Sequence, residues 1–476
     1  MTKLPLQVKN YLFNNTQLFF LLFFLTALLA RLYLRSSLLE LDEAEQVIWA
    51  QQLLSGYPNQ PPLYSWLQYC LFQVLGINLI SLALLKYTLL LGCLYYYHLI
   101  CRYYCPNKSL ALSATAAWVL ISSISMDLLK DNTHSILALL TACMTWYWFI
   151  TPTKSINNWY IRLGIVIGLG FLSKFNYLIF LVIFLISTVI QKEYRLKLVN
   201  WRILITIACI LIIIFPYGHW LMHHYQVGLY STYKLTPQQK TLFDGFINLL
   251  GASIFFIMPV LISSYFFFPL AFSYKKTAAT DLLLHYHFIY FPILALIILT
   301  AGIRNFEMRW LIPILFLSPL LLFSHLKPNS HLTSYTKRFL VFCLLVQLIF
   351  LVILSYRSYY GHNKRKSIPI IEIANSHKNN LEQIDSLMSD SHWLLGNMQL
   401  QFKSAQPYLY VINQALQSPS GHALILWEGE TIPSWAEALI KQFKTNDIRW
   451  IKDKKNKKIV AGQALIHCNT QKSQTA

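Results

Sequence analysis

The chain has 476 residues, of which 56% are hydrophobic and only 12% are charged. Soluble domains carry about a quarter of charged residues, so this composition excludes a protein that is soluble along its whole length. The formal charge of +20 does not indicate nucleic-acid binding, because the lysines and arginines lie in short segments between apolar runs and form no basic stripe interleaved with aromatic residues.

Apolar runs follow one another over the first three quarters of the chain, and a bilayer core of roughly 30 Å requires about 20 helical residues per crossing. We expect an all-α polytopic bundle of about eleven spans, at 15–34, 77–100, 109–126, 134–150, 159–173, 175–190, 203–221, 247–271, 287–302, 310–325 and 338–356. The stretch 159–190 is divided near Ser173 and Lys174, because basic residues both precede and follow it and so place its two flanks on one side.

The basic residues also predict the orientation of the bundle. With the N-terminus inside, fifteen lysines and arginines fall on inner segments and eight on short outer loops, so we expect a cytoplasmic N-terminus. Eight of the ten acidic residues in 1–356 then fall on the outer side. Any chemistry is therefore expected at the outer face of the membrane.

Residues 357–476 are expected to form a separate extracytoplasmic domain after a transmembrane domain at 1–356. They hold nine of the nineteen acidic residues in a quarter of the length. Their hydrophobic pattern predicts a small α/β domain without a catalytic motif of its own, with strands at 423–427, 448–451 and 459–466, a helix at 434–443 and a charged turn at 452–458.

The acidic segment, residues 40–45, follows the first span and contains Glu40, Asp42, Glu43 and Glu45. Like charges crowded at the mouth of a span favour a raised pKa for some of them, which is one way to prepare a base or a metal site. A structural interpretation is also open: Asp42 and Glu45 have the spacing of a capping box for a helix over 43–54 that lies along the membrane interface.

A second polar cluster contains Asp127, Lys130, Asp131 and His134, whose spacing would place all four on one face of a helix. The alternative is a solvated ion-pair stripe at the end of a span, with Asp131 as the N-cap.

The segment 168–176 is rich in glycine and contains Ser173 and Lys174. Its glycines would allow close helix packing. The residues alone allow Lys174 to be a lysine that extends its side chain to the membrane surface.

Three motifs carry a family resemblance: Leu41-Asp42-Glu43-Ala44-Glu45-Gln46 with Trp49, Gly56-Tyr57 and Gln60-Pro61-Pro62-Leu63; Lys130 to His134; and the segment 168–176. They resemble the first outer loop, the second outer loop and a glycine-rich segment of the GT-C glycosyltransferases of the protein O-mannosyltransferase superfamily. Bacterial members include the lipid A aminoarabinose transferase and the rhizobial galacturonosyltransferases. The resemblance covers roughly residues 35–190.

The resemblance implies a multi-pass protein of the bacterial inner membrane. It would move a sugar from a polyprenyl-phosphate donor to a lipid A or core glycan, another glycoconjugate or a protein, with inversion at the anomeric carbon. Asp42 matches the catalytic acid/base and Glu43 its usual neighbour, and a divalent cation at Glu43 and Asp131 is left open. The residues expected at the donor sugar or phosphate are Lys130, Asp131, His134, Lys174, Gln60, which replaces a frequent His or Lys, and Arg309.

Two other classes of protein compete with this interpretation. A transporter or flippase would place ionisable residues in the middle of spans and show two related halves, whereas here the polar residues gather at span ends and no internal repeat is evident. A scaffold protein would leave the two acidic clusters unexplained.

Overall fold

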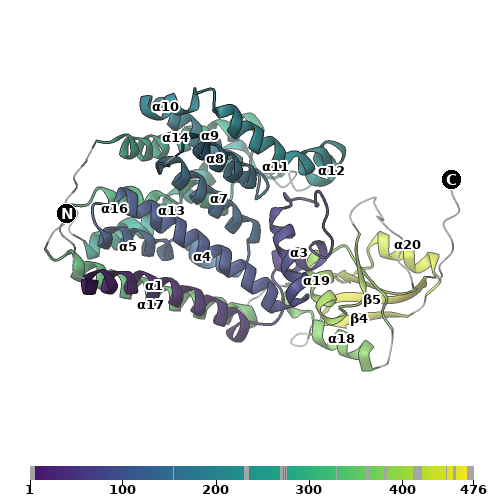
Figure 1. Cartoon of the computed structure of the whole chain (residues 1–476). Helices are drawn as coiled ribbons and strands as arrows, with labels where there is room; N and C mark the ends of the chain where they lie inside the picture. Colours follow the sequence, from purple (N-terminus) through teal and green to yellow (C-terminus); the bar gives the residue numbers. More distant parts are fainter. Residues whose placement is uncertain are drawn as a thin grey trace. The chain divides into compact units, whose positions relative to one another are not determined.

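The computed structural model is mostly helical and describes residues 6–153, 155–229, 235–268, 272, 274, 276–327, 330–360, 364–379, 383–410, 421–445, 447–453 and 457–468 (Figure 1). The chain divides into two compact units. The helical unit comprises Met1–Leu29, Leu54–Tyr64 and Leu84–Ile353, and the sheet unit comprises Ala30–Leu53, Ser65–Ala83 and Leu354–Ala476.

Seven helices among the described residues are long and apolar enough to cross a membrane, or up to nine segments if each of two bent helix pairs is one span. The seven are Thr16–Leu34, which combines most of α1 (Leu6–Leu29) with the π-helical turn η1 (Ala30–Leu34), α4 (Leu79–Tyr104), α7 (Thr133–Ile150), α11 (Ile203–His223), α13 (Leu242–Phe267), α14 (Ala278–Ala301) and α17 (Leu332–Tyr360). The protein is therefore a polytopic helical membrane protein, and the expected count of eleven spans is not confirmed.

The division of the stretch 159–190 is confirmed, because α8 (Ile156–Phe171) ends before Ser173 and α9 (Asn176–Ile190) begins after Lys174. Helix α9 is followed by α10 (Lys192–Leu198) after a bend of 116°.

The expected span at 310–325 is instead three short helices: η5 (Met308–Leu311), α15 (Ile312–Leu315) and α16 (Ser318–Ser324). Pro313 and Pro319 lie near the starts of α15 and α16. Proline has no backbone N–H to continue the helical hydrogen bonds, so each short helix begins anew.

The expected span at 109–126 is also interrupted. It consists of α5 (Lys108–Ala116), the 3₁₀ turn η2 (Ala117–Leu120), the π-helical turn η3 (Ser123–Asp127) and α6 (Leu128–Lys130), with a bend of 70°. The bend lies at Ile121, whose backbone is extended (φ −87°, ψ 105°).

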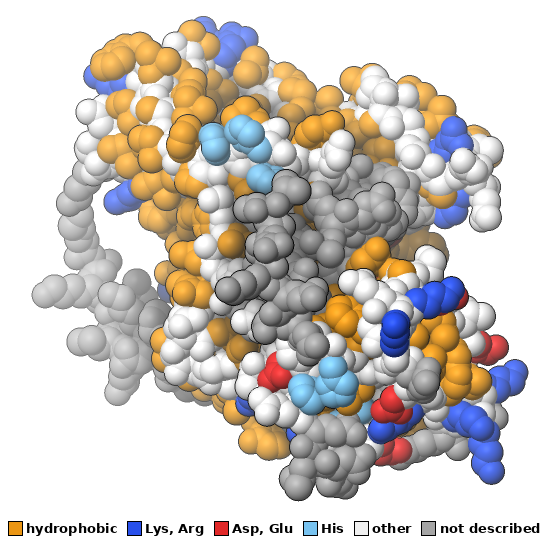
Figure 2. Space-filling view, turned by 90° about the vertical axis from the view of Figure 1, so that its right-hand side faces the viewer, with side chains coloured by type: hydrophobic (Ala, Val, Ile, Leu, Met, Phe, Trp, Pro, Cys, Tyr) orange, Lys and Arg blue, Asp and Glu red, His pale blue; other side chains and the backbone are white. Residues whose placement is uncertain are grey.

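Glycines allow close packing within the helical unit. A Cβ atom at Gly164 of α8 would lie 2.7 Å from the Thr206 carbonyl oxygen of α11. One at Gly170 would lie 2.1 Å from the Tyr177 ring, so the predicted packing role of the glycine-rich segment is confirmed. On the outside of the unit, apolar side chains such as Ile212 and Phe255 are 74% and 72% exposed. Hydrophobic side chains cover much of the upper part of the view in Figure 2, as a lipid-facing surface requires.

The sheet unit contains a five-stranded mixed sheet with the strand order β2-β1-β3-β5-β4. Strand β1 pairs in parallel with β2 and β3, whereas β5 pairs antiparallel with β3 and β4. The strands are β1 (Ser386–Ser389), β2 (Gln406–Leu409), β3 (Gly421–Glu428), β4 (Ile448–Lys452) and β5 (Ile459–Cys468). The three predicted strands are confirmed as β3, β4 and β5, and part of the predicted turn between the last two lies outside the described residues.

Helices cover both faces of this sheet. On one face α18 (Ile370–Asn379) and α19 (His392–Gln401) share a buried apolar core with Leu387, Leu424 and Leu426. On the other face α20 (Ser434–Gln442), which confirms the predicted helix, packs against Ile425 and Trp427.

The short helix α2 (Leu41–Trp49) belongs to the same unit and packs on α19. Its apolar residues Ala44, Val47 and Ile48 are buried. A Cβ atom at Gly396 of α19 would lie 2.5 Å from the Ala44 carbonyl oxygen, so the two helices approach closely. The expected helix over 43–54 thus begins and ends earlier, and its apolar face is covered by protein.

Candidate active site

The acidic segment forms the first turn of α2. Glu40 precedes the helix with an extended backbone, and Glu43 Oε2 accepts a hydrogen bond from the Glu40 backbone N–H at 3.1 Å. Glu40 and Glu43 therefore form the capping box, and the prediction that Asp42 and Glu45 form it is wrong. Both pairs have the same spacing, but the helix begins at Leu41.

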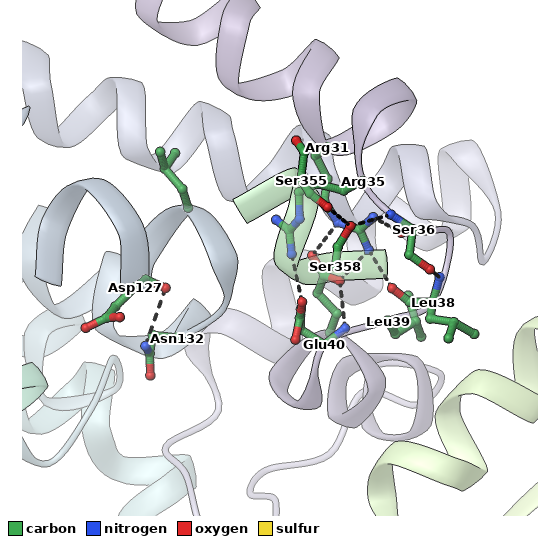
Figure 3. A network of polar contacts seen from close by, with 12 residues as sticks. Arg31, Arg35, Ser36, Leu38, Leu39, Glu40, Asp127, Asn132, Ser355 and Ser358 are labelled. Carbon is green, nitrogen blue, oxygen red and sulfur yellow. Dashed lines mark hydrogen bonds and ion pairs between the residues drawn. The ribbon is translucent and has the colours of Figure 1, made fainter. Parts of the chain in front are cut away.

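A buried ion pair fastens this turn to the end of the first helix. Arg31 of η1 donates from Nη2 to Glu43 Oε2 at 2.6 Å and from Nε to Glu43 Oε1 at 3.1 Å. The side chains of Arg31 and Glu43 are 0% and 1% exposed. Arg31 also donates to the backbone carbonyls of Ser36 and Leu38 at 3.0 and 3.3 Å (Figure 3).

A second arginine pairs with another carboxylate of the segment. Arg35 Nη2 lies 3.0 Å from Glu40 Oε1, and both side chains are largely buried. Two of the four crowded carboxylates are thus neutralised by arginine, which relieves the repulsion expected from the sequence. The sequence did not predict that Arg31 and Arg35 pair with the acidic segment. A signal for this role is their i, i+4 spacing at the end of an apolar span, just before the acidic segment.

Asp42 is the second residue of α2 and is half-buried. The first turn of a helix favours negative charge through its unsatisfied N–H groups. One turn later Gln46 is buried, and its Oε1 accepts a hydrogen bond from Ser65 Oγ at 2.9 Å. The carboxylate of Asp42 therefore stands at a helix start that is fixed on both sides by polar contacts.

The second polar cluster lies in the helical unit, but not on one helical face as the spacing predicts. Helix α6 ends at Lys130, Asn132 is left-handed (φ 63°, ψ 46°), and α7 begins at Thr133. Asn132, not Asp131, is the N-cap position. The helix stops here because Asn tolerates the left-handed conformation that most residues avoid, and its Nδ2 donates to the Asp127 carbonyl at 3.4 Å (Figure 3).

The structure brings His134 together with the glycine-rich segment. His134 Nδ1 lies 3.3 Å from the Ser173 carbonyl oxygen, and its ring packs against Tyr64 with centroids 5.4 Å apart. Lys174 Nζ donates to Ser135 Oγ at 2.8 Å. Two motifs that lie about 40 residues apart in the sequence therefore form one polar cluster.

Backbone contacts hold the loop that carries Gln60. The Leu63 N–H donates to the Leu172 carbonyl at 3.0 Å, and the Asn59 N–H donates to the Val227 carbonyl at 3.3 Å. A Cβ atom at Gly56 would lie 2.1 Å from the Trp220 ring, so only glycine fits this approach without movement. Gln60 is half-buried within this loop.

Arg309 lies beside the break between α6 and α7. Its Nη1 donates to Asn132 Oδ1 at 3.3 Å, and its Nε lies 2.5 Å from Glu307 Oε2. The helical unit thus holds Lys130, Asp131, His134, Lys174, Gln60 and Arg309, and the sheet unit holds Asp42 and Glu43.

Comparison with known proteins shows which families and relatives the chain is similar to. The family described as dolichyl-phosphate-mannose-protein mannosyltransferase matches residues 59–220. The lipopolysaccharide core galacturonosyltransferase RgtA of Rhizobium johnstonii is 28% identical over 446 residues, which cover 88% of each chain. Together with the motifs, these matches support membership of the GT-C glycosyltransferase superfamily. A second relative of this glycosyltransferase, the galacturonosyltransferase RgtB of the same organism, is 30% identical over 296 residues, or 59% of each chain.

The fold of the glycosyltransferase is similar to that of a solved membrane-protein structure, ArnT. The crystal structure of ArnT from Cupriavidus metallidurans bound to undecaprenyl phosphate matches 93% of this chain and 97% of its own with a TM-score of 0.67 at 11% identity. The same protein in its apo state gives a TM-score of 0.62. The superfamily predicted from the motifs is confirmed, as is the class of enzyme.

No group of three or more His, Cys, Asp and Glu side chains that could hold a metal ion occurs among the described residues of the glycosyltransferase. The part of the chain that the structure describes therefore offers no preformed metal site, and the divalent cation stays an untested alternative.

One further ionisable residue was missed in the sequence of the glycosyltransferase. Lys86 lies in α4 and is 0% exposed, beside Tyr87, whose hydroxyl donates to the Leu129 carbonyl at 3.1 Å. The signal was available, because a single lysine within an apolar span is costly and marks a functional candidate.

Proposed function

We propose that this enzyme moves a sugar from a polyprenyl-phosphate donor to a glycan acceptor at the periplasmic face of the bacterial inner membrane. The observation that carries the proposal is the half-buried carboxylate of Asp42 in the fixed first turn of α2, within a motif that resembles the first outer loop of the superfamily. The similarity to two lipopolysaccharide core galacturonosyltransferases supports a core glycan as acceptor and a uronic acid as the sugar.

In the proposed reaction an acceptor hydroxyl oxygen attacks the anomeric carbon of the donor sugar. Asp42 takes the hydroxyl proton as the new C–O bond forms. The bond between the anomeric carbon and the phosphate oxygen breaks, and its electron pair leaves with the polyprenyl phosphate. Attack opposite to the leaving group inverts the anomeric centre, and Asp42 returns its proton to water.

The polar cluster of the helical unit would serve the leaving group. Lys174, Lys130, Arg309 and His134 supply hydrogen-bond donors and positive charge, which stabilise the phosphate as negative charge develops on it. Asp131 and Gln60 would bind hydroxyl groups of the sugar. Glu43 would tune the neighbouring Asp42 carboxylate.

Purified enzyme in lipid vesicles, given a panel of polyprenyl-phosphate sugars and lipid A core glycans, tests the proposal. We expect product with inverted configuration from at least one donor, and a kcat about 10²–10⁴-fold lower for Asp42→Asn, because the amide cannot accept the proton. Asp447→Asn is the matched control: Asp447 forms an exposed pair with Arg449, and such pairs contribute little.

Two results would contradict the proposal. Normal turnover by Asp42→Asn removes the catalytic assignment. Movement of the lipid-linked sugar across the vesicle membrane without a new glycosidic bond favours a flippase instead.

A further inference from the structure

The ion pair between Arg31 and Glu43 connects three consecutive parts of the chain. Arg31 lies in η1, at the end of the first helix, and Glu43 lies in the first turn of α2. The Nη1 and Nη2 groups of Arg31 also donate to the carbonyls of Ser36 and Leu38, in the connection between these helices. One buried guanidinium therefore holds the end of one helix, the connection and the start of the next (Figure 3).

Both carboxylate oxygens of Glu43 take part in this arrangement. Oε1 accepts from Arg31 Nε, and Oε2 accepts from Arg31 Nη2 and from the Glu40 backbone N–H. A planar guanidinium that binds a carboxylate with two parallel hydrogen bonds fixes its geometry more closely than a single ion pair does. Burial of both charges is tolerated only because they are paired and hydrogen-bonded.

The backbone around this pair is held from a second side within the sheet unit. The Leu39 N–H donates to Asn397 Oδ1 at 2.8 Å, and Trp393 Nε1 donates to the Leu39 carbonyl at 2.7 Å. The Ser36 N–H donates to Ser358 Oγ at 3.0 Å (Figure 3). Asp42 follows this segment directly, so its backbone has little freedom to move.

We propose that Arg31 and Glu43 are positioning residues that set the direction of the Asp42 carboxylate, and that Glu43 takes no part in proton transfer. The inference rests on the proposed function, in which Asp42 is the base. Asp42 directly precedes Glu43 in the chain and lies between Glu40 and Glu43, the two residues of the capping box. A loss of the ion pair moves the start of α2, and a displacement of about 1 Å at a catalytic group lowers the rate by up to about 10²-fold.

Four variants test this role: Arg31→Met, Glu43→Gln, the double variant Arg31→Met with Glu43→Gln, and Arg31→Lys. We expect kcat to fall about 10- to 100-fold in either single variant, with the KM for the donor within about threefold of wild type. The double variant is expected to be no slower than the slower single one, because residues that act as a unit are not additive. Arg31→Lys keeps the charge without the planar fork and is expected to be intermediate.

The pH dependence of kcat distinguishes positioning from chemistry. The variants at Arg31 and at Glu43 should keep the limb that reports the base, because Asp42 still accepts the proton. The role is overturned if Glu43→Gln abolishes that limb, or if Arg31→Met keeps at least a third of the wild-type kcat while Glu43→Gln does not. Multiplying effects in the double variant would also overturn it.

Separate variants test for general effects on folding and for the role of Asp42 as the base. Glu437→Gln removes an exposed ion pair of the same unit, 2.6 Å from Lys441, and should leave kcat unchanged. If Arg31→Met does not fold, Arg31→Lys and Glu43→Gln still decide between the outcomes. Normal turnover by Asp42→Asn defeats the proposed function and the positioning role together. An inactive Asp42→Asn with full activity in Arg31→Lys and Glu43→Gln defeats the positioning role alone.

Discussion

Lys174 combines features that suit a phosphate ligand. It lies in the glycine-rich segment 168–176, and its Nζ donates to Ser135 Oγ at 2.8 Å, next to the buried His134 in the chain. An ammonium held by a hydroxyl group at a defined place stabilises an anion better than a freely moving side chain does. This contact favours the phosphate role over a lysine that only reaches for the membrane surface.

Replacement of Lys174 by glutamine should therefore slow transfer. We expect kcat/KM for the polyprenyl-phosphate donor to fall about 10- to 100-fold in Lys174→Gln, because one positive charge at the developing phosphate is lost. Initial rates over a range of donor concentrations measure the change. Lys240→Gln is the matched control, since Lys240 also donates a hydrogen bond, to Asn305 Oδ1 at 2.6 Å, but is exposed. Equal losses in the two variants would argue against a specific role.

At the level of elements, the contact between α2 and α19 links the C-terminal part of the chain to the segment that bears Asp42. Gly396 approaches the Ala44 backbone so closely that any side chain must displace one helix. Trp393 and Asn397, on either side of Gly396, bind the two backbone groups of Leu39. Helix α19 therefore supports the chain on both sides of Asp42, at Leu39 three residues before it and at Ala44 two residues after it.

The variant Gly396→Val should lower both stability and activity. A valine side chain in this close approach costs about 1–3 kcal/mol of the free energy of unfolding through overpacking. We expect a lower Tm in detergent and a kcat reduced at least fivefold at a temperature where the variant remains folded. Gly251→Ala serves as the control, because Gly251 lies within helix α13 and no atom lies within 4 Å of a Cβ at that position. A lower Tm with an unchanged kcat would show that the contact serves stability alone.

Elements that local contacts determine were predicted from the sequence, whereas a helix start that depends on a distant contact was not. Strands β3, β4 and β5 and helix α20 were predicted from local periodicity, and the break between α8 and α9 from charge. The start of α2 was not, because Glu40/Glu43 and Asp42/Glu45 offer the same capping spacing. In the structure Glu40 and Glu43 form the capping box, and Glu43 also makes a buried contact with Arg31, twelve residues away. The capping spacing by itself carries no information on such a partner.

The same reasoning applies to the two candidate clusters. In the structure His134 Nδ1 lies 3.3 Å from the Ser173 carbonyl oxygen. The sequence motifs assigned His134 and Lys174 to one expected donor site, and this role stays a prediction. They did not predict the left-handed Asn132 that interrupts the helix between Lys130 and Thr133. A change of conformation at one residue turns the side chains on its two sides in different directions, so helical spacing overstated how many of them share a face.

For the whole molecule, the proposed reaction requires one orientation in the membrane. Polyprenyl-phosphate sugars and core glycans are used on the periplasmic side in the proposed function, so the sheet unit must lie there and α10, with Lys192 and Arg195, must lie in the cytoplasm. The excess of basic residues on the presumed inner segments predicts the same arrangement.

Labelling of single cysteines tests this orientation in spheroplasts. Cys70 is exposed and Cys209 partly so, and both are first replaced by serine; the other six cysteines are buried. A membrane-impermeant maleimide should then label Lys441→Cys in intact spheroplasts, because Lys441 is 74% exposed in the sheet unit. It should label Lys192→Cys only after the membrane is opened. The reverse pattern would place Asp42 on the side without the lipid-linked donor, and transfer at the periplasmic face would then be impossible for this chain.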